Sequence, residues 1–119
     1  MAVASQEIAR TSWREYFDEF SRTIGTAEVT IEVAGRDLGD QIAAERLVLT
    51  GITYDDKDDV LVVALDTGGS RDEYEHMIDS PQKIYVATLD NGETTFEVTD
   101  GEDHQQLIHV RPAEALPPA

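Results

Sequence analysis

Several short segments between residues 28 and 111 alternate apolar with polar side chains, and this pattern most limits what the chain can fold into. A two-residue period is that of a β-strand with one buried and one solvent-facing side. We expect antiparallel neighbours, because only short turns separate these segments. The expected strands of this kind are residues 29–33, 47–54, 84–89, 94–99 and 106–111. Residues 60–65 are a continuous apolar run too short for a helix, and we expect a central strand there.

Glycines mark two irregular points in this pattern. The apolar positions of residues 47–54 change phase at Gly51, which predicts a bulge or a tight bend there. The sequence Asp90-Asn91-Gly92 predicts a hairpin with a type I′ turn. Residues 36–46 fit a loop, a short helix or the entry to a strand equally well.

One amphipathic helix precedes the strands. Trp13, Tyr16, Phe17, Phe20 and Ile24 repeat at helical spacing and form one apolar, mostly aromatic face. Gly25 follows as the expected C-terminal cap. We expect Trp13, Phe17 and Phe20 to be buried under the sheet, since a single domain offers this face no other apolar partner.

Two capping boxes predict where helices begin. Ser12 and Glu15 form the first, and Ser70 and Glu73 form the second. A second, short helix is therefore expected after Ser70, with Tyr74, Met77 and Ile78 on one face. The Pro81 segment ends it.

These elements predict an α+β domain over residues 1–111, with residues 112–119 as a frayed, Pro-rich tail and the first ten residues as a loose lead. The expected architecture is a strongly bent antiparallel sheet or small barrel of five to six strands, covered by the N-terminal amphipathic helix and carrying one short second helix.

The formal net charge of −16 limits the possible partners. Nucleic acids and anionic membranes attract Lys and Arg, so neither is an expected partner. Cysteine is absent, which excludes disulfides and Cys-based metal sites. No targeting or membrane segment is recognisable, so a cytoplasmic protein is expected. The few lysines and many aspartates also fit adaptation to a saline habitat.

The most acidic segment is the expected turn Asp55-Asp56-Lys57-Asp58-Asp59. Asp55, Asp56, Asp58 and Asp59 could together attract a divalent cation, but their spacing lacks the alternate ligands and the glycine of a dedicated calcium loop. We therefore predict no metal site and interpret the segment as a solvated hairpin tip.

The histidines give no stronger signal. His76 would share a helix face with Glu73 and Asp79, a spacing that forms dimetal centres only when four helices contribute ligands. His109 is expected at the edge of the core, and His104 stands near the same strand. No catalytic motif or cofactor-binding motif occurs, so no catalytic residue and no cofactor are predicted.

The sequence resembles two known protein families. Residues 28–66 resemble the first half of an Sm-like barrel, with a preceding helix, a bent strand containing Gly51 and a turn containing Asp55. The Asn and the Arg-Gly motif with which that family holds RNA are missing here. This resemblance therefore implies a barrel without RNA binding.

The whole chain is similar to a small bacterial and archaeal family of domains of unknown function. The matching pieces are the Trp13-x-x-Tyr16-Phe17-Asp18 segment, residues 51–55 with Asp58 and Asp59, and His76-Met77-Ile78 followed by Pro81. No catalytic residue is carried over from this resemblance.

The function expected from the sequence is a small acidic, non-enzymatic domain that mediates protein interaction or self-association. A first alternative is a metal-assisted enzyme that uses the Asp55–Asp59 cluster. A second alternative is an acidic decoy for basic nucleic-acid-binding proteins, which would require one continuous negative face.

We predict that the melting temperature rises between 0.1 M and 1 M NaCl. A chain of net charge −16 repels itself in the compact state. Salt shortens the Debye length from about 10 Å to about 3 Å over this range. Thermal unfolding followed by circular dichroism measures the effect, and a flat or falling melting temperature would contradict it. Sulfate is avoided because it also strengthens apolar burial.

Overall fold

The computed structural model describes residues 5–35, 39–66 and 73–113. Its helical elements are a 3-10 turn (Arg10–Ser12) and α1 (Trp13–Thr23). The strands are β1 (Ser5–Glu7), β2 (Ala27–Gly35), β3 (Gly39–Asp55), β4 (Val60–Asp66), β5 (Glu73–Asp79), β6 (Lys83–Thr88), β7 (Thr94–Thr99) and β8 (Gln105–Pro112).

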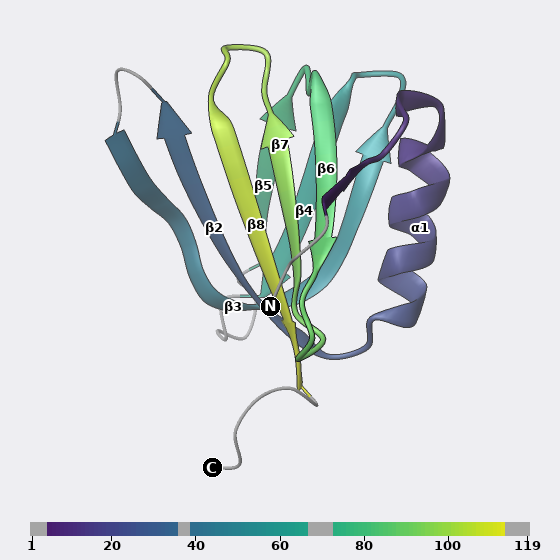
Figure 1. Cartoon of the computed structure of the whole chain (residues 1–119), viewed down its shortest axis with the longest axis vertical. Helices are drawn as coiled ribbons and strands as arrows, with labels where there is room; N and C mark the ends of the chain where they lie inside the picture. Colours follow the sequence, from purple (N-terminus) through teal and green to yellow (C-terminus); the bar gives the residue numbers. More distant parts are fainter. Residues whose placement is uncertain (1–4, 36–38, 67–72, 114–119) are drawn as a thin grey trace.

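The strands form a single antiparallel sheet in the order β1-β6-β7-β8-β2-β3-β4-β5. The sheet folds over on itself, so that β4 and β5 lie behind β6, β7 and β8 (Figure 1). The long strand β3 joins the two layers. Its first half, up to Val48, pairs with β2, and its second half, from Val48, pairs with β4. β1 and β5 are the two edges of this open sheet.

Apolar side chains from both layers meet between them. Alternate residues of β2 and β8 point inward, among them Val29, Ile31, Ile108 and Val110, all of them fully buried. Among the described residues of the sheet, Phe96 of β7 is the largest fully buried side chain. The side chains on one face of each of these strands therefore form the core, as the two-residue period predicts.

The aromatic face of α1 fills the space that the sheet leaves open at one side (Figure 1). Trp13 and Phe17 are buried, whereas Phe20 is only partly covered, so the prediction is confirmed for the first two residues. The ring centroids of Phe17 and Phe96 are 5.1 Å apart. Trp13 stands edge-to-face against Tyr54 at the same distance. Such pairs add to the free energy gained from burial alone.

A serine of α1 anchors the helix to β3. The Ser21 hydroxyl accepts a hydrogen bond from the Ile52 amide at 3.0 Å and donates one to the Ile52 carbonyl at 2.9 Å. The pairing of β3 with β4 shifts between Leu49 and Gly51, which confirms the predicted bulge. Ser21 thus satisfies main-chain groups at a stretch of β3 that no longer pairs with β2.

The predicted fold class is wrong in two respects. Within the described residues the sheet has eight strands rather than five to six, and it is open rather than a barrel. The expected second helix is instead the strand β5, and the loose lead contributes β1. The ambiguous segment 36–46 enters β3 at Gly39, and residues 36–38 lie outside the described part.

The error at β5 has a physical cause. Tyr74, Met77 and Ile78 fit a helical period, but Tyr74, His76 and Ile78 fit a strand period equally well. A segment of seven residues is too short for periodicity to decide. Pairing with β4, where His76 lies opposite Val63, decides in favour of the strand.

Capping and turn chemistry are only partly as predicted. Ser12 is the residue before α1 but makes no side-chain capping bond. Of the second predicted box, Ser70 lies outside the described residues, and Glu73 begins the strand β5 and not a helix. Gly25, at a φ of +70°, does follow the end of α1. The hairpin at Gly92 is confirmed, but Asn91 lacks the positive φ of a type I′ turn. Gly92 alone, at +90°, takes that conformation.

The buried position of Phe17 yields a stability prediction. Phe17→Ala should lower the free energy of unfolding by about 3–5 kcal/mol, because removing the buried ring leaves a cavity beside Phe96. Urea denaturation followed by Trp13 fluorescence measures the loss, since Trp13 is the only tryptophan. Arg22→Ala on the exposed side of α1 is the control and should change stability by less than about 0.5 kcal/mol. A loss below about 1 kcal/mol in Phe17→Ala would show that the helix is not packed as described.

Candidate functional site

The acidic turn Asp55–Asp59 connects β3 and β4, as predicted for a hairpin tip. Asp55 accepts hydrogen bonds through Oδ1 from the amides of Lys57, at 2.9 Å, and of Asp58, at 3.3 Å. Asp56 lies 3.6 Å from Arg14 of α1. The carboxylates of Asp55 and Asp56 therefore contact different neighbours and do not converge on one point.

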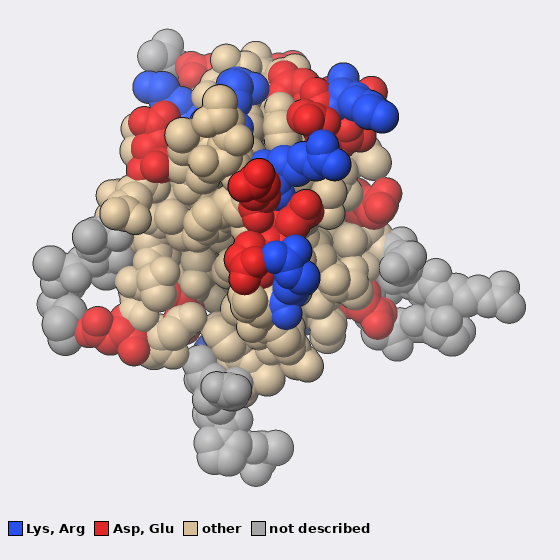
Figure 2. All heavy atoms as spheres, turned by 90° about the vertical axis from the view of Figure 1, so that its right-hand side faces the viewer, with Lys and Arg blue, Asp and Glu red and all other residues tan. Residues whose placement is uncertain are grey.

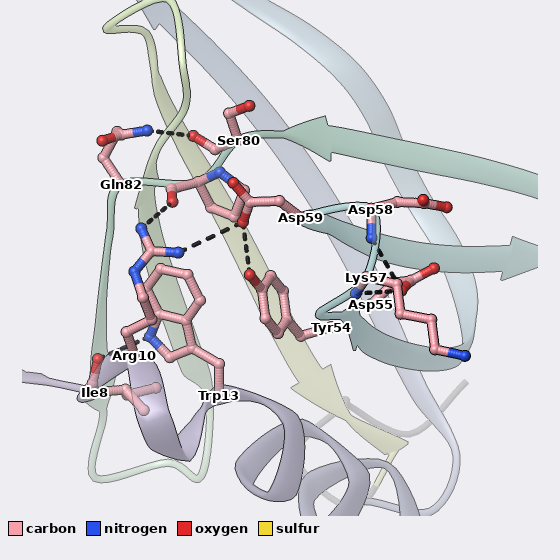
Figure 3. A network of polar contacts seen from close by, with 11 residues as sticks. Ile8, Arg10, Trp13, Tyr54, Asp55, Lys57, Asp58, Asp59, Ser80 and Gln82 are labelled. Carbon is pink, nitrogen blue, oxygen red and sulfur yellow. Dashed lines mark hydrogen bonds and ion pairs between the residues drawn. The ribbon is translucent and has the colours of Figure 1, made fainter.

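Asp59 belongs to a cluster around Arg10 (Figure 3). Its Oδ1 accepts a hydrogen bond from the Tyr54 hydroxyl at 2.5 Å and lies 3.4 Å from the Arg10 guanidinium. Arg10 also donates to the carbonyl of Pro81 at 2.9 Å and lies 4.4 Å from the centre of the Trp13 ring. Burial and the Asp59 carboxylate together raise the pKa of Tyr54. This cluster joins the start of α1 to the ends of β3 and β5.

Among residues 5–35, 39–66 and 73–113, no group of three or more His, Asp or Glu side chains is placed to hold a metal ion. Figure 2 shows the face that carries α1, where Lys and Arg lie among Asp and Glu. Arg22, for example, pairs with Glu19 on the helix. This face is therefore not the continuous negative surface that an acidic decoy would need.

The edge strand β5 presents main-chain groups away from the sheet. The Ser80 amide bonds to the carbonyl of Asp59 on the β4 side, at 2.8 Å. The Asp79 carbonyl points the other way and accepts from the Gly101 amide at 3.1 Å. Because this orientation alternates along an antiparallel strand, the N–H and C=O groups of Glu75 and Met77 also point outward. Within the described residues, no hydrogen bond to these groups is found.

A hollow of about 570 Å³ lies at the end of this edge, between β5 and the turn that joins β7 to β8. Its lining includes Met77, Asp79, Ser80, Gln82, Glu102 and Gln106. Asp79 and Glu102 are both exposed, so the rim is acidic. Met77 is 53% exposed and adds an apolar side chain to this rim. We call the outward side of residues 74–79 together with this hollow the β5 edge site.

A chain of polar side chains supports the hollow from inside. His76 of β5 lies 2.6 Å from Gln106 Oε1 of β8, and Gln106 Nε2 donates to Asp100 Oδ2 at 3.0 Å. Asp100 Oδ1 accepts from the amides of Glu102 and His104, each at 2.9 Å. Asp100 and Gln106 are buried. The chain therefore holds β5 against the β7–β8 turn across the interior.

Asp100 remains ionised in this position. Burial alone would raise the pKa of its carboxyl, but the hydrogen bonds from Gln106, His104 and Glu102 outweigh it, and the pKa is lowered. His104 adds a weaker attraction, with its Nδ1 at 3.5 Å from Asp100 Oδ2. The negative charge of Asp100 is thus part of the folded structure.

The three histidines occupy places that the sequence indicated only in part. His109 lies half-buried on β8 and opposite in direction to the buried Ile108, as predicted. His76 is on a strand and not on a helix face with Glu73 and Asp79, so that grouping is wrong. Gln106, Asp100 and Arg10 were not singled out. The strand period of Tyr74, His76 and Ile78 was the signal that could have revealed β5.

The fold and this edge define a small, mostly β domain that has one α-helix in its described part and an acidic edge strand. A model of a family of unknown function, DUF5335, matches residues 4–119, and the chain belongs to that family. An uncharacterised protein from Aquifex aeolicus (strain VF5) is 36% identical over 115 residues, which cover 97% of this chain and 99% of the relative. No solved structure matches the chain. These findings confirm the expected resemblance to a family of unknown function.

Membrane insertion through a helix finds no support in the described residues, because α1 is neither long nor apolar enough to cross a bilayer.

The lowered pKa of Asp100 gives a prediction with a definite sign. Asp100→Asn should cost about 1–3 kcal/mol at pH 7, because it removes charge-assisted hydrogen bonds in a buried place. A carboxyl whose pKa is lower in the folded state contributes stability above its unfolded pKa, near 3.9, and loses it as pH falls through the folded value. The difference in free energy of unfolding between the unmodified protein and Asp100→Asn should therefore become smaller below about pH 4.

Urea denaturation of both proteins between pH 7 and pH 3 measures this difference. Asp58→Asn at the exposed turn serves as the control and should change the free energy of unfolding at pH 7 by less than about 0.5 kcal/mol. An Asp100→Asn penalty that stays constant through the acid range would show that the charge of Asp100 does not contribute.

Proposed function

We propose that this protein is a protein-interaction domain that binds an extended, basic segment of a partner protein as an additional strand beside β5. The observation that carries the proposal is the β5 edge site, where outward main-chain groups adjoin an acidic hollow. Strand addition is a recurring mode of peptide recognition in which main-chain bonds give affinity and side-chain pockets give specificity.

The main chain of β5 has N–H and C=O groups that could pair with the main chain of such a partner. The carbonyl of Asp79 is already bonded to Gly101, so the available stretch ends there. The N–H and C=O groups of Glu75 and Met77 remain for the incoming strand. Unpaired edges of this kind are usually protected in proteins that do not use them.

The charges at the site select the chemistry of the partner. Glu75, Asp79 and Glu102 are exposed beside the edge and the hollow. Opposite charges on directly facing residues stabilise a strand pair, whereas like charges destabilise it. A second copy of β5 would bring Glu75 and Asp79 against carboxylates of the same kind. A segment rich in Lys or Arg would bring opposite charges.

Exposed apolar side chains supply the remaining contact area. Met77 is 53% exposed and lines the hollow, and Tyr74 is 40% exposed on the same strand. A methionine adapts its shape to different partners because its side chain is unbranched and flexible. We infer that the aliphatic stem of a partner Lys or Arg lies on Met77 while its charged end reaches Asp79 or Glu102.

The proposal is tested with a short blocked peptide in which Lys alternates with Val, and with a matched peptide in which Glu replaces each Lys. Binding to the whole chain is measured by calorimetry and by amide chemical shifts. We expect saturable binding of the Lys peptide, with shifts at residues 74–79 and 101–102, and at least about tenfold weaker binding of the Glu peptide.

Two variants at one position separate main-chain pairing from side-chain contact. Met77→Pro removes an outward N–H without touching the ladder to β4, and Met77→Ala keeps that N–H. Binding should fall at least about tenfold in Met77→Pro and only a few-fold in Met77→Ala. Thermal unfolding checks that both variants remain folded.

Three results would contradict the proposal. The first is equal binding of the Lys and Glu peptides, and the second is equal loss in the two Met77 variants. The third is a dimer, detected by sedimentation at working concentrations, that Met77→Pro dissociates. This last result would assign the edge to a second copy of the chain.

A further inference from the structure

The solvent-facing side of β2 and β8 carries a second hollow, separate from the β5 edge site. It has a volume of about 220 Å³ and is lined by Glu28, Thr30, Arg46, Glu93, His109 and Arg111. Glu28 and Thr30 face Arg111 and His109 across the β2–β8 pairing. These side chains point away from the core, because Val29, Ile108 and Val110 between them are buried.

A backbone irregularity brings Arg46 into this hollow. The register between β2 and β3 shifts on both sides of Ile31, and Arg46 on the opposing stretch has a φ of +55°. An arginine rarely takes this left-handed conformation. Thr30 Oγ1 accepts a hydrogen bond from the Arg46 amide at 3.2 Å and holds the distortion. Bulges of this kind often redirect a side chain at a functional site.

The charges in the hollow are only partly compensated. Arg111 Nε lies 3.5 Å from Glu93, but this nitrogen is buried and makes no hydrogen bond. His109 lies 3.5 Å from Glu32 and 3.1 Å from Thr95. Among the ion pairs of the described residues, none includes Glu28 or the Arg46 guanidinium. An acid and a base thus line one small hollow without bonding to each other.

We propose that this hollow binds a small zwitterion, a free α-amino acid. Its carboxylate would lie on the Arg46 guanidinium, the Arg111 Nε–H group and the Thr30 hydroxyl, and its ammonium group on Glu28. A guanidinium matches the two oxygens of a carboxylate, and a buried N–H that makes no hydrogen bond gains most from such an acceptor.

Two further observations favour a zwitterion over a simple ion. A lone anion would have to approach a chain of net charge −16 and two lining carboxylates, whereas a zwitterion carries no net charge. A lone cation would leave Arg46 and Arg111 Nε unsatisfied. At about 30 Å³ for each water, the hollow has room for about seven waters, which matches a small amino acid.

The experiment titrates the isotope-labelled whole chain with glycine and alanine, and in parallel with acetate and with methylamine, which carry only one of the two charges. Amide chemical shifts report binding. We expect saturable shifts at residues 28, 30, 46, 109 and 111 with the amino acids at millimolar concentration, and at least about tenfold weaker effects with acetate or methylamine.

Charge-removing variants assign the site. Arg46→Gln and Glu28→Gln should each weaken amino-acid binding at least about tenfold, because each removes one of the two complementary charges. Arg22→Gln on α1 is the matched control and should leave binding unchanged. The proposal is overturned by an absence of saturable shifts, by acetate or methylamine binding as tightly as glycine, or by unchanged binding in either hollow variant.

Discussion

The packing of Phe17 against Phe96 supports the rest of this structure. A single sheet that folds over on itself encloses an apolar interior between its two layers. On the side where β3 passes from one layer to the other, the sheet alone does not cover this interior. The aromatic face of α1 covers it there, and Ser21 satisfies the main chain of Ile52 at the same place. Without this helix, the interior on that side would be open to water, and the main chain of Ile52 would lose its hydrogen-bond partner.

Polar groups hold the folded sheet where apolar packing ends. Arg10, Tyr54 and Asp59 join the start of α1 to the ends of β3 and β5, and the His76–Gln106–Asp100 chain joins β5 to the β7–β8 turn. Both sets make hydrogen bonds within the described part of the chain, so the acidic residues in them contribute to the folded structure. In the sequence, the Asp55–Asp59 turn was the strongest candidate for a cation site. In the structure, Asp55, Asp56 and Asp59 each contact different neighbours.

The two proposed binding sites use opposite sides of β8. Gln106 points inward and supports the β5 edge site, whereas His109 and Arg111 point outward into the second hollow. A partner at β5 and a small ligand on β2 and β8 can therefore be present together.

The sequence by itself determined most strands, the position of α1, the bulge at Gly51 and the burial of Trp13 and Phe17, because these depend on local periodicity and on the presence of one aromatic face. The strand β5, the open sheet and both hollows were decided only by tertiary structure. Residues 73–79 fit both a helical and a strand period, and only pairing with β4 selects the strand. β3 links the two layers of the sheet because its first half pairs with β2 and its second half with β4. Arg46 and Arg111 stand far apart in the sequence, and only the register of β2 with β3 and β8 places them around one hollow.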